Sequence, residues 1–349
     1  MDYQGQLSQL LSSSDEANVL LALEMAKGVP ETDLSELLMN YQELHECLIG
    51  EVVGGILKAA HIIALNQPEI NASNRNLTAI PNCINQLKNL RKLSLFDNQL
   101  TSVPETIGEL TNLRELDLGD NGLHALPESI GNLKNLEKLY LAWNQIDELP
   151  ASLTCLIKLS ELSLRNNLLM EIPDWIGDLK QLRVLNLSEN SIASLPSSLG
   201  DLKHLKRLYL NYNLLTFFPE GLRNLTRLEI LSVYVNELIE LPDWLGDLES
   251  LQELYLSGNR LVALPDSLRN LLQLEILDLG NNQLSTLPTW LSVFKKLDSL
   301  RVGDNQLTTL PECLGDIYTL DLLDVRDNPL PLSEVEKIDK IIDISHYFF

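Results

Sequence analysis

Residues with the chemistry for catalysis or metal binding are few in this chain of 349 residues, and their spacing supports neither role. The sequence contains no HExxH, no CxxC pair, no GxGxxG, no nucleophile elbow and no kinase signature. The histidines and cysteines are scattered, at His45, His61, His124, His204, His346, Cys47, Cys83, Cys155 and Cys313. We therefore expect no enzyme activity, no cofactor and no metal site.

One polar residue type does recur at a fixed spacing. An asparagine returns every 23 residues, at Asn98, Asn121, Asn144, Asn167, Asn190, Asn213, Asn236, Asn259, Asn282, Asn305 and Asn328. A carboxamide offers both donors and an acceptor, so a buried asparagine can satisfy backbone groups that a sharp turn leaves without partners. We predict that each of these side chains bonds to its own turn and to the neighbouring one.

The elements that position these asparagines follow from the rest of the period, LxxLxLxxNxLxxLPxxLGxLxx. The LxL alternation predicts a short strand with one buried face. Prolines recur from Pro81 to Pro311, and the segment after each proline returns the chain along the opposite side. Units of this kind stack on one another, so we expect parallel strands about 4.8 Å apart in a solenoid.

Both ends of the array depart from the period. Residues 66–332 are expected to form the solenoid, in which a degenerate opening unit at 66–88 precedes eleven 23-residue units. Terminal repeats are atypical because one face of their core has no neighbour. Residues 1–65 are expected to form an N-terminal helical cap, and residues 333–349 a C-terminal capping helix.

Three helices are predicted within the N-terminal cap. The first follows a capping-box pattern at Ser13 and Glu16, and the second and third show helical spacing of their apolar residues. Gly54 and Gly55 weaken the third. The expected ranges are 16–27, 32–47 and 51–66.

The chain carries 49 acidic and 26 basic side chains, a formal net charge of −23, with the acidity spread along its length. Binding to nucleic acid or to an anionic membrane requires a positive footprint, so we expect neither partner. The acidity favours a basic protein partner, and solubility explains it equally well. No signal peptide and no apolar run of 18 residues is visible, which predicts a cytoplasmic protein.

With LPxxIGxLxxL at 23-residue spacing, residues 66–328 resemble the intracellular Ras-group leucine-rich repeats. This group includes the Ras-pathway scaffold and Ras-suppressor proteins and the repeat domains of ROCO and Scribble-type proteins, and bacterial chains share the pattern. The resemblance implies an α/β leucine-rich repeat solenoid, a curved horseshoe with a parallel sheet on its concave face. It also implies protein–protein recognition in intracellular signalling. It does not carry over a partner, because those families differ in the residues that bind, and a small GTPase or another signalling protein is one candidate. ROCO proteins need a GTPase module, and no GxxxxGK[ST] occurs in this chain.

The x positions around the strand leucines are expected to face solvent on the concave side. They form columns that run from Ser94 to Asp324, from Phe96 to Arg326 and from Asp97 to Asp327. Aromatic and arginine side chains, which dominate protein interfaces, gather there. The candidate partner-binding residues are Tyr140, Trp143, Arg165, Arg207, Tyr209, Tyr212, Ile230, Tyr234, Val235 and Tyr255. The alternative is that tyrosine is simply a good strand residue and that neighbouring rings stack on one another.

Two further groups have an ordinary structural explanation. Trp175, Trp244 and Trp290 each follow a proline by two residues, and we expect them to pack on the convex flank rather than to bind. Acidic pairs one period apart, Asp97 with Asp120 and Asp304 with Asp327, could attract a cation, but solvated surface charge explains them better.

Two functions fit these observations. The first is a non-catalytic interaction module or scaffold that binds a protein on its concave surface. The alternative is a repeat arm or effector subunit of a larger assembly, ubiquitin-ligase-type bacterial effectors included, that docks through residues 1–65. Cys47, in a short helical segment, matches the nucleophile of such a ligase poorly. We favour a monomer.

Overall fold

The computed structural model describes residues 3–27, 31–50, 57–334, 336 and 346–348. The chain divides into two compact units, Met1–Ser163 and Leu164–Phe349. Within the described residues, no helix is both long and apolar enough to cross a membrane.

The first unit begins with four helices where the sequence predicted three. They are α1 Tyr3–Leu11, α2 Glu16–Ala26, α3 Glu31–Leu48 and α4 Ala59–Leu65. α1 was missed because its sequence is mostly glutamine, serine and glycine, and tertiary packing rather than pattern holds it, with Leu7 and Leu11 fully buried. The predicted third helix is shorter than expected, and residues 51–56 lie outside the described part of the chain.

The cap of α2 also differs from the prediction. Asp15, not Ser13, is the N-cap residue, and its carboxylate accepts from the backbone N–H of Ala17 at 2.9 Å. Ser13 instead accepts from the backbone N–H of Asp15 at 3.1 Å. A carboxylate is favoured here because it satisfies a free N–H and also complements the positive end of the helix.

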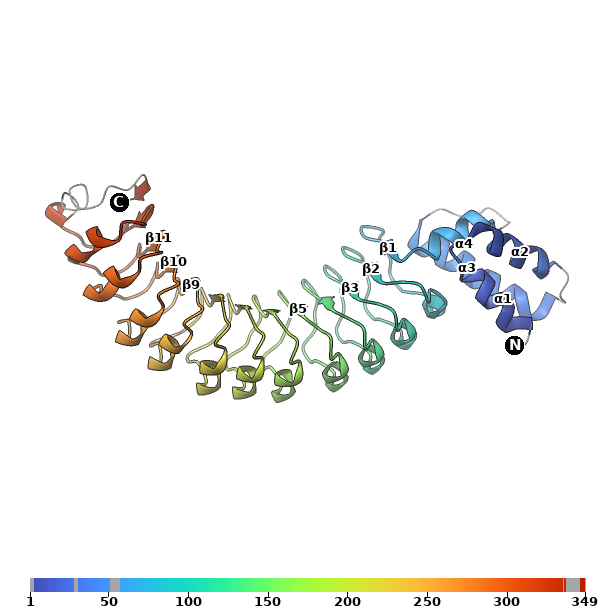
Figure 1. Ribbon diagram of the computed structural model, residues 1–349, viewed down its shortest axis with the longest axis horizontal. Coiled ribbons are helices and arrows are strands. Elements are labelled where there is room, and N and C mark those ends of the chain that lie inside the picture. The colour runs from blue at the N-terminus through green and yellow to red at the C-terminus, as the bar shows by residue number, and fades with distance from the viewer. Residues whose placement is uncertain (1–2, 28–30, 51–56, 335, 337–345, 349) are drawn as a thin grey trace. The chain divides into compact units, whose positions relative to one another are not determined.

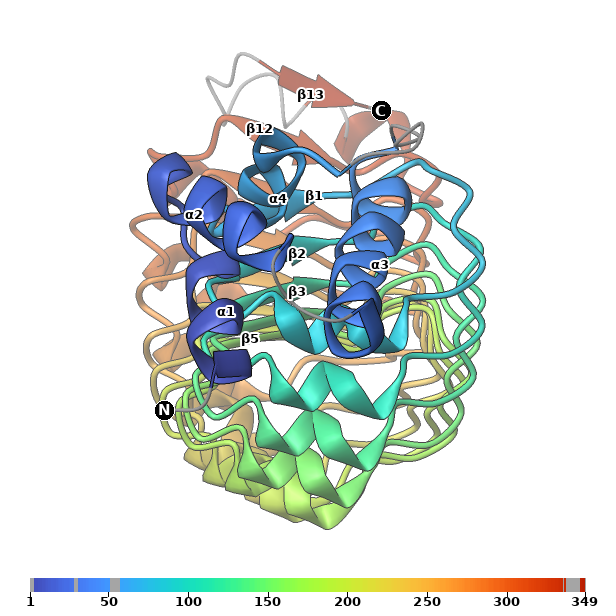
Figure 2. The ribbon, with the colours of Figure 1, turned by 90° about the vertical axis from the view of Figure 1, so that its right-hand side faces the viewer.

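These helices cover the edge of the repeats in the first unit, as predicted (Figure 2). The side-chain amide of Asn66 donates to the backbone carbonyls of Leu11 and Ser13 at 2.6 and 2.8 Å. Asn89, in the opening repeats, donates to the carbonyl of Ser12 at 2.6 Å. The polar end of α1 is therefore tied to the solenoid while its leucines join the core.

Parallel strands then follow one per repeat. The first unit contains β1 Glu69–Asn71, β2 Lys92–Ser94, β3 Glu115–Asp117, β4 Lys138–Tyr140 and β5 Glu161–Ser163. Neighbouring strands pair in parallel with a 23-residue register, for example Leu93 with Leu116. After each proline the chain makes a short 3₁₀ turn, at Asn82–Gln86, Glu105–Glu109, Glu128–Asn132 and Ala151–Cys155.

The second unit continues the same architecture (Figure 1). Its strands are β6 Val184–Asn186, β7 Arg207–Tyr209, β8 Ile230–Ser232, β9 Glu253–Tyr255, β10 Ile276–Asp278, β11 Ser299–Arg301, β12 Leu322–Asp324 and β13 His346–Phe348. The 3₁₀ turns are Asp174–Asp178, Ser197–Asp201, Glu220–Asn224, Asp243–Asp247, Asp266–Asn270, Thr289–Val293 and Glu312–Asp316.

The C-terminal segment begins as predicted and ends differently. Residues 332–334 and 336 are helical, and the predicted helix otherwise falls on residues 335 and 337–345, which lie outside the described part. His346–Phe348 is a strand, β13, that pairs in parallel with β12. The repeat pattern does not predict β13, because residues 346–348 lie outside the leucine period.

The predicted role of the asparagines is confirmed. All eleven donate from Nδ2 to the backbone carbonyl three residues earlier, at 2.9–3.1 Å. In the second unit Asn282, for example, also donates to the carbonyl of Leu256 in the preceding repeat at 3.0 Å and accepts from the N–H of Leu261 at 3.0 Å. The leucines of the period fill the core between these turns.

The residue directly before each of these asparagines adopts a left-handed backbone conformation, which the sequence analysis did not predict. Its φ lies between 48° and 67° in all eleven repeats: Asp97, Asp120, Trp143, Asn166, Glu189, Tyr212, Val235, Gly258, Asn281, Asp304 and Asp327. This conformation suits glycine, asparagine and aspartate and is costly for other residue types. Seven of the eleven positions hold a favoured type, so the other four need an explanation.

Candidate functional site

The solvent-facing side of the sheet in the second unit carries most of the candidate residues. In β7, Leu208 is fully buried while Arg207 is exposed and Tyr209 half-buried, because alternate residues of a strand point to opposite faces. Tyr209, Tyr234 and Tyr255 all lie outside the buried core. We call Arg207, Tyr209, Tyr212, Ile230, Tyr234, Val235 and Tyr255 the tyrosine surface.

Tyr212 and Tyr234 form the centre of the tyrosine surface. Their rings meet edge to face, with centroids 5.2 Å apart and an interplanar angle of 80°. Such a pair contributes about 0.5–1.5 kcal/mol beyond the area it buries. Even so, Tyr212 keeps 48% of its surface exposed and the neighbouring Val235 keeps 39%. The pair is therefore rigid and still available for contact.

Buried polar groups support this centre from below. Asn211 Oδ1 accepts from Ser232 Oγ at 2.7 Å and from the backbone N–H of Tyr234 at 3.1 Å. The expectation that these columns face solvent is wrong here, since Ser188 and Asn211 in the column of Phe96 and Ser232 in the column of Ser94 are all buried. Their side chains are short, and larger neighbours on the same face cover them. Asn211 and Ser232 thus act as hydrogen-bonding supports that fix the backbone beneath Tyr234.

Arg165 lies in the same unit but is committed to an ion pair. Its Nε and Nη2 atoms contact Glu189 Oε1 at 2.9 and 2.6 Å, and Asn166 Nδ2 donates to Glu189 Oε2 at 2.9 Å. Arg165 and Glu189 are close enough to Tyr234 to influence its pKa, which burial raises above the ordinary value. Sequence reasoning missed Glu189. It could have been found because it is an acidic residue that lies about one repeat after Arg165 in the chain.

Tyr255 closes the tyrosine surface on its C-terminal side. Its hydroxyl donates to Glu253 Oε2 at 2.9 Å, and burial together with this carboxylate raises the pKa of Tyr255 to about 12. The ring is therefore a neutral hydrogen-bonding group at any physiological pH.

Left-handed backbone strain coincides with the tyrosine surface. Of the four positions that lack glycine, asparagine or aspartate, Tyr212 and Val235 belong to this surface and Glu189 holds Arg165. A β-branched or bulky residue at positive φ costs of order 1–2 kcal/mol. Strain of this size, at exposed apolar side chains, is a physical reason to suspect function rather than stability.

The first unit contributes two candidates, Tyr140 and Trp143. Tyr140 ends β4 and is half-buried, and burial and the Glu161 carboxylate hold its pKa well above the ordinary value. Trp143 is the fourth strained position, with φ of 60° and 48% of its surface exposed. The structure therefore places in this unit a second exposed aromatic group with the same backbone signature.

Other candidates from the sequence are structural. Trp244 is buried against Phe218, with ring centroids 6.3 Å apart, and Trp290 Nε1 donates to Asp266 at 3.0 Å. Among the described residues no group of three histidine, cysteine or acidic side chains is placed to hold a metal ion.

Two exposed apolar residues lie just beyond Asn213, and sequence reasoning missed one of them, Leu214. Leu214 and Phe217 are 47% and 54% exposed and follow Asn213 closely in the chain. The position of Leu214 holds glutamine in four other repeats, such as Gln145 and Gln283, and an exposed leucine in one, Leu168, so a column-by-column comparison finds these two apolar residues.

Comparison with known proteins agrees with this architecture. A leucine-rich repeat region model matches residues 69–167 and 151–256, and a model of two leucine-rich repeats matches residues 249–292. No curated protein matches the chain. A leucine-rich repeat protein of Leptospira interrogans is 31% identical, with 92% of this chain and 100% of the other covered and a TM-score of 0.62.

Two other structures extend the comparison. An internalin of Listeria monocytogenes is 22% identical over 89% of this chain and 94% of its own, with a TM-score of 0.69, which shows the shared fold. The ectodomain of the Arabidopsis receptor kinase HAESA, in complex with a peptide hormone, is 33% identical over 76% of this chain and 46% of its own, with a TM-score of 0.65. Membership of the Ras group stays a prediction. On its repeats, its asparagine bonds and these matches, the chain belongs to the leucine-rich repeat family.

Proposed function

We propose that this chain is a non-catalytic interaction module that binds a polypeptide partner on the tyrosine surface. The observation that carries the proposal is the exposed Tyr212–Tyr234 pair beside Val235, with two of the three residues in a strained left-handed conformation. Aromatic groups held rigidly on a sheet offer a large contact area at little entropic cost.

Two further observations support a binding role over catalysis. The HAESA ectodomain, a related repeat structure, is in complex with a peptide hormone. Burial and the Glu43 carboxylate raise the pKa of Cys47 to about 11, the opposite of what an activated nucleophile requires. A cytoplasmic scaffold in signalling is the setting we propose, and Tyr140 and Trp143 are a further contact group in the first unit.

The test is a double variant, Tyr212→Ala with Tyr234→Ala, used as bait beside the wild-type chain in a quantitative pull-down from the source cell. Tyr318→Ala is the matched control, because Tyr318 is 88% exposed in the same unit and lies outside the tyrosine surface. We expect partners retained by the wild type and the control to be lost from the double variant. If the double variant retains every partner, the tyrosine surface is not the binding site.

Docking through the N-terminal helices is the second candidate function. Leu20, Leu21 and Met39 are about half exposed, and Leu20 and Met39 line a hollow of about 600 Å³ between α2 and α3. Leu20→Glu with Met39→Glu places charges on this apolar face without touching the core. A wild-type chain that is oligomeric by light scattering and a variant that is monomeric would support this function, whereas two monomers would argue against self-association.

A further inference from the structure

The charge on the solvent-facing side of the sheet changes sign within the second unit. Around the tyrosine surface, Arg183 and Arg207 have no carboxylate within 4 Å among the residues described in this unit. From β9 onward the sheet face carries two arginines, Arg301 and Arg326. It also carries eight carboxylates: Glu253, Glu275, Asp278, Asp298, Asp304, Asp321, Asp324 and Asp327.

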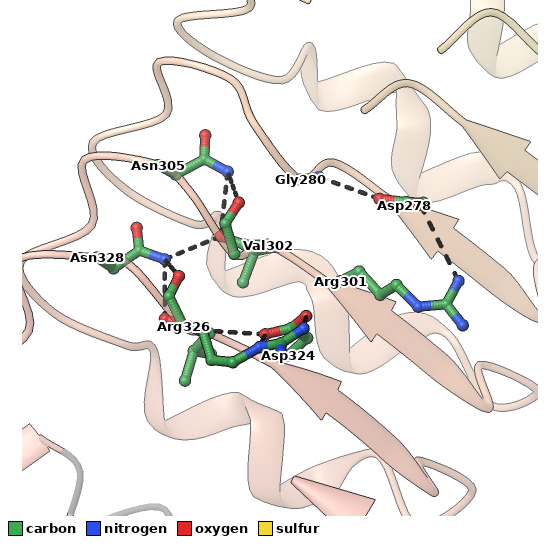
Figure 3. A network of polar contacts seen from close by, with 10 residues as sticks. Asp278, Gly280, Arg301, Val302, Asn305, Asp324, Arg326 and Asn328 are labelled. Carbon is green, nitrogen blue, oxygen red and sulfur yellow. Dashed lines mark hydrogen bonds and ion pairs between the residues drawn. The ribbon is translucent and has the colours of Figure 1, made fainter. Parts of the chain in front are cut away.

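Both of these arginines already lie against carboxylates (Figure 3). Arg326 contacts Asp324 through Nε at 2.9 Å and Nη2 at 2.6 Å, and Arg301 Nη1 lies 4.0 Å from Asp278 Oδ2. Burial raises the pKa of Asp278 above its ordinary value, although the N–H of Gly280 and Arg301 both stabilise its charge. The region over β9–β12 therefore keeps a surplus of negative charge.

The residues at the centre of this acidic region have small side chains or none. The column that holds Tyr234, two residues beyond the end of β8, continues as Ser257, Gly280 and Gly303 in the next three repeats. At Gly280 an added Cβ would lie in ordinary van der Waals contact, 3.4 Å from Asp278 Oδ1, so the glycine leaves room that a side chain could fill. The backbone of a partner can therefore approach the sheet closely at this point. At the tyrosine surface the large side chains prevent such an approach.

We propose that the partner presents an extended segment with one aromatic or large aliphatic residue on the tyrosine surface and lysine or arginine side chains over β9–β12. This inference rests on the proposed function and adds the chemistry of the partner. The apolar residue seats against Tyr212, Tyr234 and Val235, and the basic residues pair with Glu253, Asp278 and Asp304. Opposite charges arranged in this order fix the direction and register of the segment.

The stacking distance gives the spacing within the partner. Strands lie about 4.8 Å apart, so Asp278 in β10 is roughly 10 Å from the β8 repeat of Tyr234. An extended chain rises about 3.3 Å per residue. The first basic residue is therefore about three residues from the apolar anchor, and a second one, over β12, about six.

The experiment is selection of a random twelve-residue peptide display library on the purified full-length chain at low ionic strength. The charge variant combines Glu253→Gln, Asp278→Asn and Asp304→Asn, of which the first two keep an oxygen that can accept from Tyr255 and Gly280. Its matched control, Glu249→Gln with Glu312→Gln and Asp316→Asn, removes the same charge from exposed positions outside the strands. Tyr212→Ala with Tyr234→Ala tests the anchor.

We expect enriched peptides with an aromatic or large aliphatic residue and a lysine or arginine about three positions away. The charge variant should bind them about tenfold more weakly than its control, and the difference should shrink in about 0.5 M salt. Enriched peptides that need the tyrosines but show no basic preference would overturn this inference and leave the proposed function intact. Enrichment that is indifferent to the tyrosine variant would overturn both.

Discussion

Replacing Asn282 with alanine tests how the asparagines hold the repeats together. Asn282 Nδ2 donates to the carbonyls of Leu256 and Leu279, both at 3.0 Å, and Oδ1 accepts from the N–H of Leu261. Asn282 Nδ2 also donates to the carbonyl of Gly280 at 3.1 Å, which accepts from the N–H of Gly258 as well. The carbonyls of Leu256 and Leu279 each have a second asparagine donor, Asn259 and Asn305, at 2.9 and 3.0 Å. The structure gives the Leu261 N–H no other acceptor within the described residues.

The expected loss of unfolding free energy depends on this difference between the carbonyls and the N–H of Leu261. The shared carbonyls each keep one hydrogen bond after the substitution, whereas the N–H of Leu261 is left buried without a partner. An orphaned buried donor costs about 1–3 kcal/mol. We therefore expect Asn282→Ala to lower the free energy of unfolding by about 2 kcal/mol, far less than the loss of several independent hydrogen bonds would suggest. Asn282→Asp should cost more, because its second oxygen faces three carbonyls without a proton to donate.

Urea unfolding followed by circular dichroism measures the loss, and amide hydrogen exchange at Leu261 locates it. Asn281→Gly is the matched control, since Asn281 is the adjacent residue, is exposed and has φ of 48°, which glycine adopts freely. We expect the control to stay within about 0.5 kcal/mol of the wild type. Unchanged protection of the Leu261 amide in Asn282→Ala, or an equal loss in Asn281→Gly, would refute the reasoning.

Three other predictions test the turns and the charges. Asn281→Val puts a β-branched residue at positive φ, and we expect urea unfolding to show a loss of about 1–2 kcal/mol that Asn281→Gly does not share. Val235→Asn relieves the same strain, so the midpoint of thermal unfolding should not fall. It also removes an exposed apolar side chain from the tyrosine surface, so binding to that surface should weaken in a titration. Burial raises the pKa of Asp278, so the folded state binds this proton more readily than the unfolded state. Asp278→Asn should therefore increase stability at neutral pH, and the gain should disappear as the pH falls below about 4, the ordinary pKa of the side chain, in unfolding curves taken from pH 7 to pH 3.

The repeats could be predicted from the sequence because each one depends on a regular spacing of leucines and on one asparagine, whose carboxamide both donates and accepts hydrogen bonds. Asn98 and Asn328 were found at opposite ends of the array from spacing alone, and both make the predicted bonds. The opposite holds for α1 and β13, which depend on packing or pairing with distant segments and carry no repeat signal. The periodic pattern therefore predicts the elements that the repeated residues stabilise, and it does not predict elements that pack against distant segments.

The candidate site was predictable only in part, because a column of the alignment does not say how deep a side chain lies. Ser232 and Tyr234 stand two residues apart on the same side of the sheet, yet Ser232 is buried and Tyr234 half-buried. Side-chain length decides the difference, since the larger residues of neighbouring repeats close over the smaller ones. The left-handed turn was within reach of the sequence, because aspartate, asparagine and glycine fill seven of its eleven positions.

At this left-handed turn the fold requires the backbone hydrogen bonds, and it does not require the side chain that some repeats carry there. At Val235 the backbone N–H bonds to the carbonyl of Ser257 at 2.8 Å, and the following Asn236 makes its usual contacts with Leu210 and Val233. Every one of these bonds involves groups that an asparagine or glycine at position 235 would leave in place, with less strain. The valine therefore contributes nothing that the turn needs, and the same holds for Tyr212. Since both side chains are exposed beside one another on the sheet face, we interpret their backbone strain as a cost that the proposed contact with another polypeptide would offset.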